Sequence, residues 1–169
     1  QPVTEEKRDY LPQEMKRNLS PTFSEKVVLV VEDNPTNQIL IQTLLEQLAL
    51  RVHAVGSGKE CLEALARQTY DLVLMDCRMP GLDGYQTTEQ IRANERKAGL
   101  PRIPIVALTA NAIAGDVDRC FAAGMDAYLS KPVDSALLRE TLEKYLGESH
   151  VSELDIAVLK DLERKTNRV

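Results

Sequence analysis

The chain has 169 residues, of which 43% are hydrophobic and 28% charged, a balance typical of a globular domain with a sizeable core. Its net charge of −5 does not favour a nucleic-acid-binding surface, so no nucleic-acid partner is expected. No apolar run approaches the roughly 20 residues that span a bilayer, and no signal peptide is recognisable. We therefore expect a cytoplasmic chain, and its start at Gln1 rather than Met predicts a fragment of a longer protein.

Two flanks enclose the predicted domain. Residues 1–25 mix prolines with balanced charges, which predicts a linker. Residues 26–147 form the predicted domain. Residues 148–152 predict a second short linker, and apolar residues at helical spacing then predict an amphipathic helix over residues 153–165.

Short apolar runs alternate with helical patterns through the central part of the chain. The runs that predict strands span residues 27–31, 51–55, 72–75, 103–108 and 126–129. The helices between and after them are expected over residues 35–48, 57–66, 85–98, 112–123 and 135–146. This alternation predicts a doubly wound α/β domain, with five flanking helices around a five-stranded parallel sheet of flavodoxin-like order 2-1-3-4-5.

The apolar residues of the first and last helices predict which faces are buried. In the first helix we expect Ile39, Leu40, Leu44, Leu45 and Leu48 to face the core. In the last we expect the same of Leu137, Leu138, Leu142 and Tyr145. We expect the helix over residues 112–123 to be the least stable of the five, because Gly115 lies inside it.

Polar residues directly follow four of the predicted strands. The first strand is followed by Glu32 and Asp33, the third ends on Asp76, and the fourth and fifth lead to Thr109 and Lys131. The carboxyl ends of parallel strands lie at one edge of a sheet, where ligands bind in this architecture. The sequence therefore predicts one site holding three carboxylates, a hydroxyl and an ammonium group.

The composition of this site indicates its chemistry. Three acids do not stay ionised together without a cation, and oxygen ligands without His or Cys favour Mg²⁺. A carboxylate can act as a nucleophile on phosphorus, which gives an aspartyl-phosphate. Asp76 is the candidate nucleophile, Lys131 the fixed cation, and Thr109 the hydroxyl donor to a phosphoryl oxygen.

Four motifs together resemble a known family. They read VVEDNPTN at 30–37, LVLMDCRMPGLDG at 72–84, ALTANA at 107–112 and YLSKP at 128–132. In this order they resemble the receiver domain of two-component response regulators over about residues 26–147. The resemblance implies that Asp76 accepts a phosphoryl group from phosphohistidine.

The resemblance also implies roles for neighbouring residues. Asp33 would bind Mg²⁺ directly, Glu32 would bind it through water, and the backbone carbonyl of Arg78 would complete the protein ligands. Thr109 and Tyr128 would form a switch pair that alters the surface around the fourth helix and fifth strand.

The residues within these motifs are similar to those of receivers inside hybrid sensor histidine kinases, notably Asn34 with Asn37 and the sequences at 109–112 and 131–133. This resemblance implies that the chain is part of a larger kinase; whether that kinase has an inner-membrane anchor is left open. The implied partner is either the kinase's dimerisation and phosphotransfer helices or a histidine phosphotransfer domain. The tail SELDIAVLKDL resembles the start of such a domain, but neither His53 nor His150 has the sequence setting of its phosphorylated histidine; both are expected at the surface.

Three alternatives stay open at this point: a binding-only pseudo-receiver, a stand-alone response regulator, and a Mg²⁺-dependent aspartyl phosphatase. The phosphatase is the weakest, because such enzymes carry a second Asp two residues after the first, where this chain has Arg78. The cysteines, Cys61, Cys77 and Cys120, lack metal-ligand spacing and are expected to be reduced, partly buried thiols. A redox role for Cys77, beside Asp76, is a minor alternative.

Overall fold

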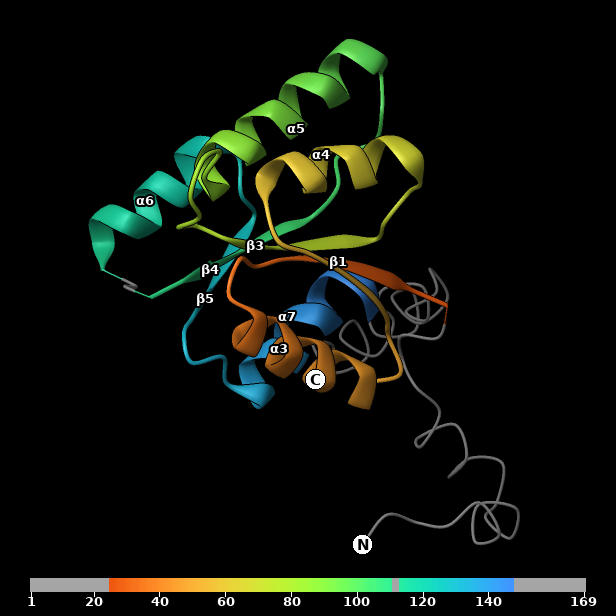
Figure 1. The fold of residues 1–169 in the computed structure, drawn as a ribbon, viewed down its shortest axis with the longest axis vertical. Coiled ribbons are helices and arrows are strands. Elements are labelled where there is room, and N and C mark those ends of the chain that lie inside the picture. Colours follow the sequence, from red (N-terminus) through yellow and green to blue (C-terminus); the bar gives the residue numbers. More distant parts are fainter. Residues whose placement is uncertain (1–24, 111–112, 148–169) are drawn as a thin grey trace, which may run out of the picture.

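The computed structural model describes residues 25–110 and 113–147. These residues form five parallel strands and five helices in alternation (Figure 1). The elements in chain order are β1 (Val27–Val31), α3 (Pro35–Gln47), β2 (Arg51–Val55), α4 (Gly58–Arg67), β3 (Leu72–Asp76), α5 (Gly84–Ala98), β4 (Ile105–Thr109), α6 (Ala114–Ala123), β5 (Ala127–Ser130) and α7 (Ser135–Leu146). The strand order is β2-β1-β3-β4-β5, which confirms the predicted topology.

Helices cover both faces of the sheet. Helices α4, α5 and α6 lie on one face, and α3 and α7 lie on the other (Figure 1). Successive side chains of a strand point to opposite faces, so β1, β3 and β4 are apolar on both sides and almost fully buried. In β3, for example, Leu72 and Leu74 face α3 and α7, whereas Val73 and Met75 face the other three helices.

The sheet thus separates two cores of different composition. The buried residues of the core against α3 and α7 are Val, Ile and Leu alone. The core against α4, α5 and α6 includes six sulfur-containing residues: Cys61, Cys77, Cys120, Met75, Met79 and Met125.

Side-chain caps fix where α3 and α5 begin, after the loops that follow β1 and β3. Asn34 caps α3: its side-chain oxygen accepts the backbone N–H of Thr36 at 2.9 Å and of Asn37 at 3.2 Å. Asp83 caps α5 in a reciprocal capping box with Gln86. Both caps follow the loops in which the polar strand-end residues lie, so they hold those loops in place.

A buried charge network joins α5 to the amino edge of the sheet. The Arg92 guanidinium, 6% exposed, bonds the Glu95 carboxylate and the Asp126 carboxylate, each at 2.8 Å. It also donates to the carbonyl of Gly124 and that of Ile103. Burial of an ion pair is tolerated where, as here, the remaining donors and acceptors are also bonded.

The predicted buried faces of α3 and α7 are partly wrong. The side chains of Ile39 and Leu40 are 64% and 48% exposed, and Ile41 is buried in their place. Leu45 is buried as predicted, and Leu44 and Leu48 pack partly buried against the same core. In α7, Leu137 is 53% exposed, while Leu138 and the next turns face the core as predicted. Apolar residues are adjacent at 39–41 in α3 and at 137–138 in α7, so hydrophobic periodicity could not select one stripe there.

Smaller differences concern element ends and flanks. The fourth strand spans Ile105–Thr109 rather than residues 103–108. The predicted flanks, apart from residue 25, lie outside the described residues. Within residues 25–110 and 113–147, no helix combines the length and apolar character needed to cross a membrane.

Candidate functional site

Three acids meet at the carboxyl edge of the sheet, as the sequence predicted. Glu32 and Asp33 follow β1, and Asp76 ends the neighbouring strand β3. Their carboxylate oxygens lie within 4.8 Å of one another. Glu32 and Asp76 are 1% and 4% exposed, whereas Asp33 is exposed, so the group opens to solvent on one side.

Lys131 supplies the positive charge. Its ammonium nitrogen lies 2.8 Å from Glu32 Oε2 and 3.2 Å from Asp76 Oδ1. Its backbone N–H donates to the carbonyl of Thr109 at 2.8 Å, and the following Lys131–Pro132 peptide bond is cis. Burial opposes the charge of Lys131, but the Glu32 and Asp76 carboxylates outweigh it and raise the pKa of the ammonium group.

The electrostatic surroundings of Asp76 set its protonation. Burial raises the pKa of the Asp76 carboxyl to about 6, and the nearby Glu32 carboxylate acts in the same direction. The backbone N–H of Arg78, which bonds Asp76 Oδ1 at 3.2 Å, and the Lys131 ammonium partly offset this rise. The Lys131 ammonium therefore compensates the Asp76 carboxylate only in part, and a bound cation would stabilise its ionised form further.

The remaining predicted site residues lie around this edge. Thr109 ends β4, is 5% exposed and follows Leu108, the register partner of Asp76. Arg78 is exposed on the loop after Asp76. Tyr128 on β5 is 39% exposed, and its ring meets that of Phe121 on α6 edge-on, with centroids 6.5 Å apart. The structure therefore brings Glu32, Asp33, Asp76 and Lys131 together and places Tyr128 on the outer surface.

Gly84 shapes the site, although the sequence pattern indicated only that it lies in a turn. A Cβ there would collide with the Asp76 carbonyl oxygen and the Cys77 Cα. Its N–H donates to the Cys77 carbonyl at 3.2 Å, which closes the loop after β3 back on the strand. Only glycine allows this approach, and the loop Pro80–Asp83 is held against the site as a result.

The donor set fits a hard divalent cation. Three carboxylate oxygens from separate side chains converge, and no His or Cys is among them. Two of the acids are buried and share one ammonium group, so a further positive charge would relieve their repulsion. Glu32, Asp33 and Asp76 are thus the residues that could hold Mg²⁺.

Comparison with known proteins identifies the family. Residues 28–143 match the family model of the response regulator receiver domain. This match covers more than half of the chain and includes all the predicted site residues. The chain belongs to the receiver domain family.

Several relatives of this receiver domain are sensor kinases. It is 46% identical over 120 residues to the sensor histidine kinase GacS of Pseudomonas protegens, and 42% identical over 138 residues to the sensor protein GacS of Pseudomonas syringae. These matches cover 71% and 80% of this chain but only 13% and 15% of the relatives. The chain therefore spans about one seventh of the length of these relatives.

Solved receiver domains share the fold. The receiver domain of the sensor histidine kinase PA1611 from Pseudomonas aeruginosa PAO1 is 47% identical, with a TM-score of 0.65; the match covers 72% of this chain and 98% of that one. That structure contains a magnesium ion coordinated in its active-site cleft. A chain in the Saccharomyces cerevisiae co-crystal structure of the phosphotransfer protein Ypd1 with the Ssk1 receiver domain is 27% identical, with a TM-score of 0.73 and coverage of 78% and 95%.

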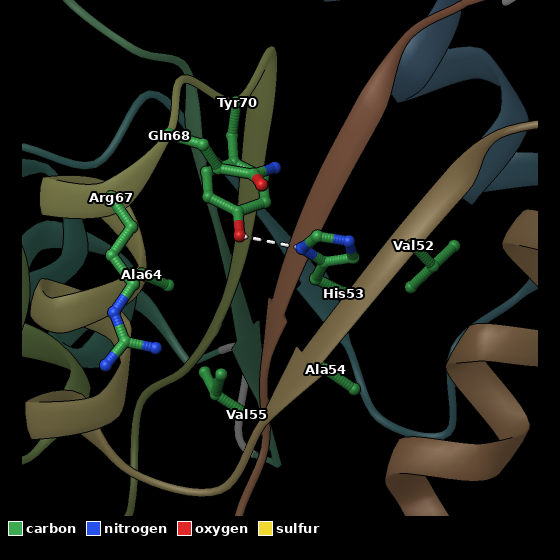
Figure 2. A pocket seen from close by; sticks show the side chains of 8 residues that line it. All are labelled: Val52, His53, Ala54, Val55, Ala64, Arg67, Gln68 and Tyr70. Carbon is green, nitrogen blue, oxygen red and sulfur yellow. Dashed lines mark hydrogen bonds between the residues drawn. The ribbon is translucent and has the colours of Figure 1, made fainter.

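A separate hollow lies beside the edge strand β2, and none of the predicted site residues lines it. Figure 2 shows the Tyr70 hydroxyl pointing at His53 Nδ1, at 2.8 Å, with Arg67 and Gln68 around it. His53 is exposed, as predicted, whereas His150 lies outside the described residues. This hollow, lined by both apolar and polar side chains, is distinct from the acidic group.

Proposed function

We propose that this chain is a working receiver in a phosphorelay and that Asp76 accepts a phosphoryl group from a phosphohistidine. The observation that carries the proposal is the placement of Asp76: a buried strand end, 3.2 Å from Lys131 and within the three-acid group. Membership of the receiver family and the sensor-kinase relatives support it. We further propose that the chain is a cytoplasmic part of a hybrid sensor histidine kinase, with an inner-membrane anchor of that parent left open.

The proposed transfer moves one phosphoryl group between two nucleophiles. An Asp76 carboxylate oxygen forms a bond to phosphorus while the phosphorus–nitrogen bond of the phosphohistidine breaks, and the imidazole keeps the electron pair. Lys131 would offset the charge carried to Asp76, and Thr109, at the end of the neighbouring strand β4, would donate its hydroxyl to a phosphoryl oxygen. When bound by Glu32, Asp33, Asp76 and the Arg78 carbonyl, Mg²⁺ would neutralise charge on the transferring oxygens.

The proposed output is a change at the surface of α6 and β5. Movement of Thr109 toward the phosphorylated Asp76 would leave space behind β4, and Tyr128 would turn inward from its exposed position to occupy it. Hydrogen exchange across residues 113–130, measured with and without a phosphoryl mimic, tests this step. Unchanged exchange on mimic binding would contradict the proposed switch.

The transfer itself is tested by intact mass after incubation with a small acyl-phosphate donor and Mg²⁺. We expect the wild type to gain one phosphoryl group, and we expect no gain without Mg²⁺ or in Asp76→Asn. Asp83→Asn is the matched control, since it changes another acid of the same loop and should still gain the group. If the wild type gains nothing from this donor or from a phosphohistidine protein, the chain is a binding-only pseudo-receiver.

The phosphatase alternative predicts a different outcome. An aspartyl phosphatase would release phosphate from simple phosphomonoesters with repeated turnover. The structure has the exposed Arg78 where such an enzyme needs a second acid, so we expect no turnover on these substrates.

We propose that the phosphohistidine arrives on a helical phosphotransfer domain that contacts the exposed apolar residues of α3 and α7. Ile39, Leu40 and Leu137 are all about half exposed or more, and they lie in the first two turns of helices that begin at the site's edge of the sheet. The receiver of the Ssk1 complex, which contacts a phosphotransfer protein, has the same fold. Ile39→Ser should slow transfer from a phosphohistidine protein and leave transfer from the small acyl-phosphate donor unchanged; equal slowing of both would contradict this docking surface.

A further inference from the structure

Two cysteines that the proposed transfer does not use lie in contact behind the phosphoacceptor. The sulfur atoms of Cys77 and Cys120 are 3.8 Å apart, although 43 residues separate them in the sequence. Cys77 directly follows Asp76, and Cys120 lies in α6. Both thiols are free, and they are only 2% and 0% exposed.

We propose that Cys77 and Cys120 form a redox-sensitive site, in which a peroxide converts the two thiols into a disulfide that ties α6 to the residue after Asp76. The inference stands apart from the proposed phosphotransfer, since it needs neither Mg²⁺ nor a phosphoryl donor. The sulfur contact carries it, because thiols already in contact need little backbone movement to reach bonding distance.

Access to the buried pair comes from α6. Among the described helices, α6 is the one whose N-cap residue, Ile113, makes no side-chain capping hydrogen bond, and Gly115 lies in its first turn. Cys77 is instead held on both sides: its N–H bonds the Leu108 carbonyl at 3.0 Å, and its carbonyl accepts from Gly84. Local opening of α6 therefore carries Cys120 toward solvent while Cys77 stays in place.

The chemistry balances with one hydrogen peroxide. The Cys120 sulfur, after losing its proton to solvent, attacks one peroxide oxygen; an S–O bond forms, the O–O bond breaks, and the leaving hydroxide is protonated to water. When α6 closes, the Cys77 sulfur attacks the Cys120 sulfur; the S–S bond forms, the S–O bond breaks, and hydroxide leaves with the Cys77 proton as a second water. Two thiols and one peroxide thus give one disulfide and two waters.

One contact between α6 and α5 contributes to the closed position of α6 and can be removed without changing either thiol. The Arg119 guanidinium of α6 lies 4.1 Å from the centroid of the Tyr85 ring, at the start of α5. Such a cation–π contact is lost when α6 opens. Arg119→Met should therefore raise the rate of disulfide formation severalfold, because it leaves both thiols intact and weakens the closed position of α6.

The experiment treats the full 169-residue chain with hydrogen peroxide, caps the remaining thiols by alkylation, and reads intact mass and peptide maps. We expect a loss of two hydrogens, one cross-linked peptide pair containing Cys77 and Cys120, and an alkylated Cys61. Cys61 is equally buried and takes no part in the sulfur contact, so Cys61→Ala is the matched control and should keep the link.

Three results would overturn the proposal: a link that includes Cys61, sulfinic acid on separate cysteines without a link, or three thiols that stay reduced. Peptide mapping of the wild type decides between them, even if Cys77→Ala or Cys120→Ala folds poorly. In the linked protein, amide exchange over residues 114–123 should slow relative to the reduced protein. Unchanged exchange there would show that the link does not restrain α6.

Discussion

Replacing Asp76 with Asn should stabilise the metal-free protein, because the ionised carboxylate lowers the free energy of unfolding. The pKa of Asp76 rises from 3.8 to about 6 on folding, mainly through burial. At about 1.4 kcal/mol for each pKa unit, this corresponds to about 3 kcal/mol between the ionised and neutral forms. The group opens to solvent beside the exposed Asp33, which screens part of this cost, so we expect a gain of about 1–2 kcal/mol in the free energy of unfolding.

The gain has a definite pH dependence. A carboxyl whose pKa is higher in the folded chain binds its proton more tightly when folded. Above about pH 7 the carboxylate is ionised in both states, and the wild type bears the full cost. As the pH falls from 6 toward 3.8, the folded chain takes up the proton first, so the advantage of Asp76→Asn shrinks and disappears below that range.

Urea denaturation without divalent cations, above and below this pH range, measures the difference. Asp83→Asn is the matched control, because Asn also caps helices and Asp83 lies outside the acidic group; its stability should stay within a few tenths of a kcal/mol of wild type. Adding Mg²⁺ should stabilise the wild type more than Asp76→Asn. If Asp76→Asn is no more stable than wild type above about pH 7, the electrostatic account of this site is wrong.

Four further substitutions and one double variant test the packing around the site and the amino edge. Lys131→Met removes the cation from the buried Glu32 carboxylate and should lower the free energy of unfolding by about 2 kcal/mol in urea denaturation; an unchanged value would show that Glu32 is otherwise compensated. Gly84→Ala, which drives a methyl group into the strand-end backbone, should cost about 3 kcal/mol or more, whereas Gly115→Ala, with open space around it, should gain up to about 1 kcal/mol. Thermal denaturation of both proteins distinguishes these directions. Arg92→Met should lower the free energy of unfolding by about 3 kcal/mol, because it leaves the Glu95 and Asp126 carboxylates without their cation. The double variant with Glu95→Gln should recover part of that loss, and a purely additive double-mutant cycle would argue against the network.

The sequence predicted that the acids and Lys131 lie together because strand ends carry two kinds of information at once. An apolar run of β3 that stops on Asp76 marks both a buried strand and its carboxyl edge, and the parallel topology then brings Glu32 and Lys131 to the same place. The roles of Thr109 and Tyr128 remain proposals, since they concern a second conformation.

What the sequence did not reveal depends on contacts between distant residues. The outward turn of Ile39 and Leu40 is fixed by the Asn34 cap and the packing of Ile41, not by periodicity. The ion pairs of Arg92 and the contact of Cys77 with Cys120 join helices and strands far apart in the chain. No local spacing encodes such neighbours, because they arise only when the sheet has assembled.

The different compositions of the two cores give the domain a stiff side and a compliant side. Branched aliphatic residues, which pack against α3 and α7, have few rotamers and hold one arrangement. Every described methionine and cysteine lies on the opposite side, where unbranched, polarisable side chains can refill space when a neighbour shifts. Displacement of α6 therefore meets a deformable interior, while the face that presents Ile39 and Leu40 keeps its shape.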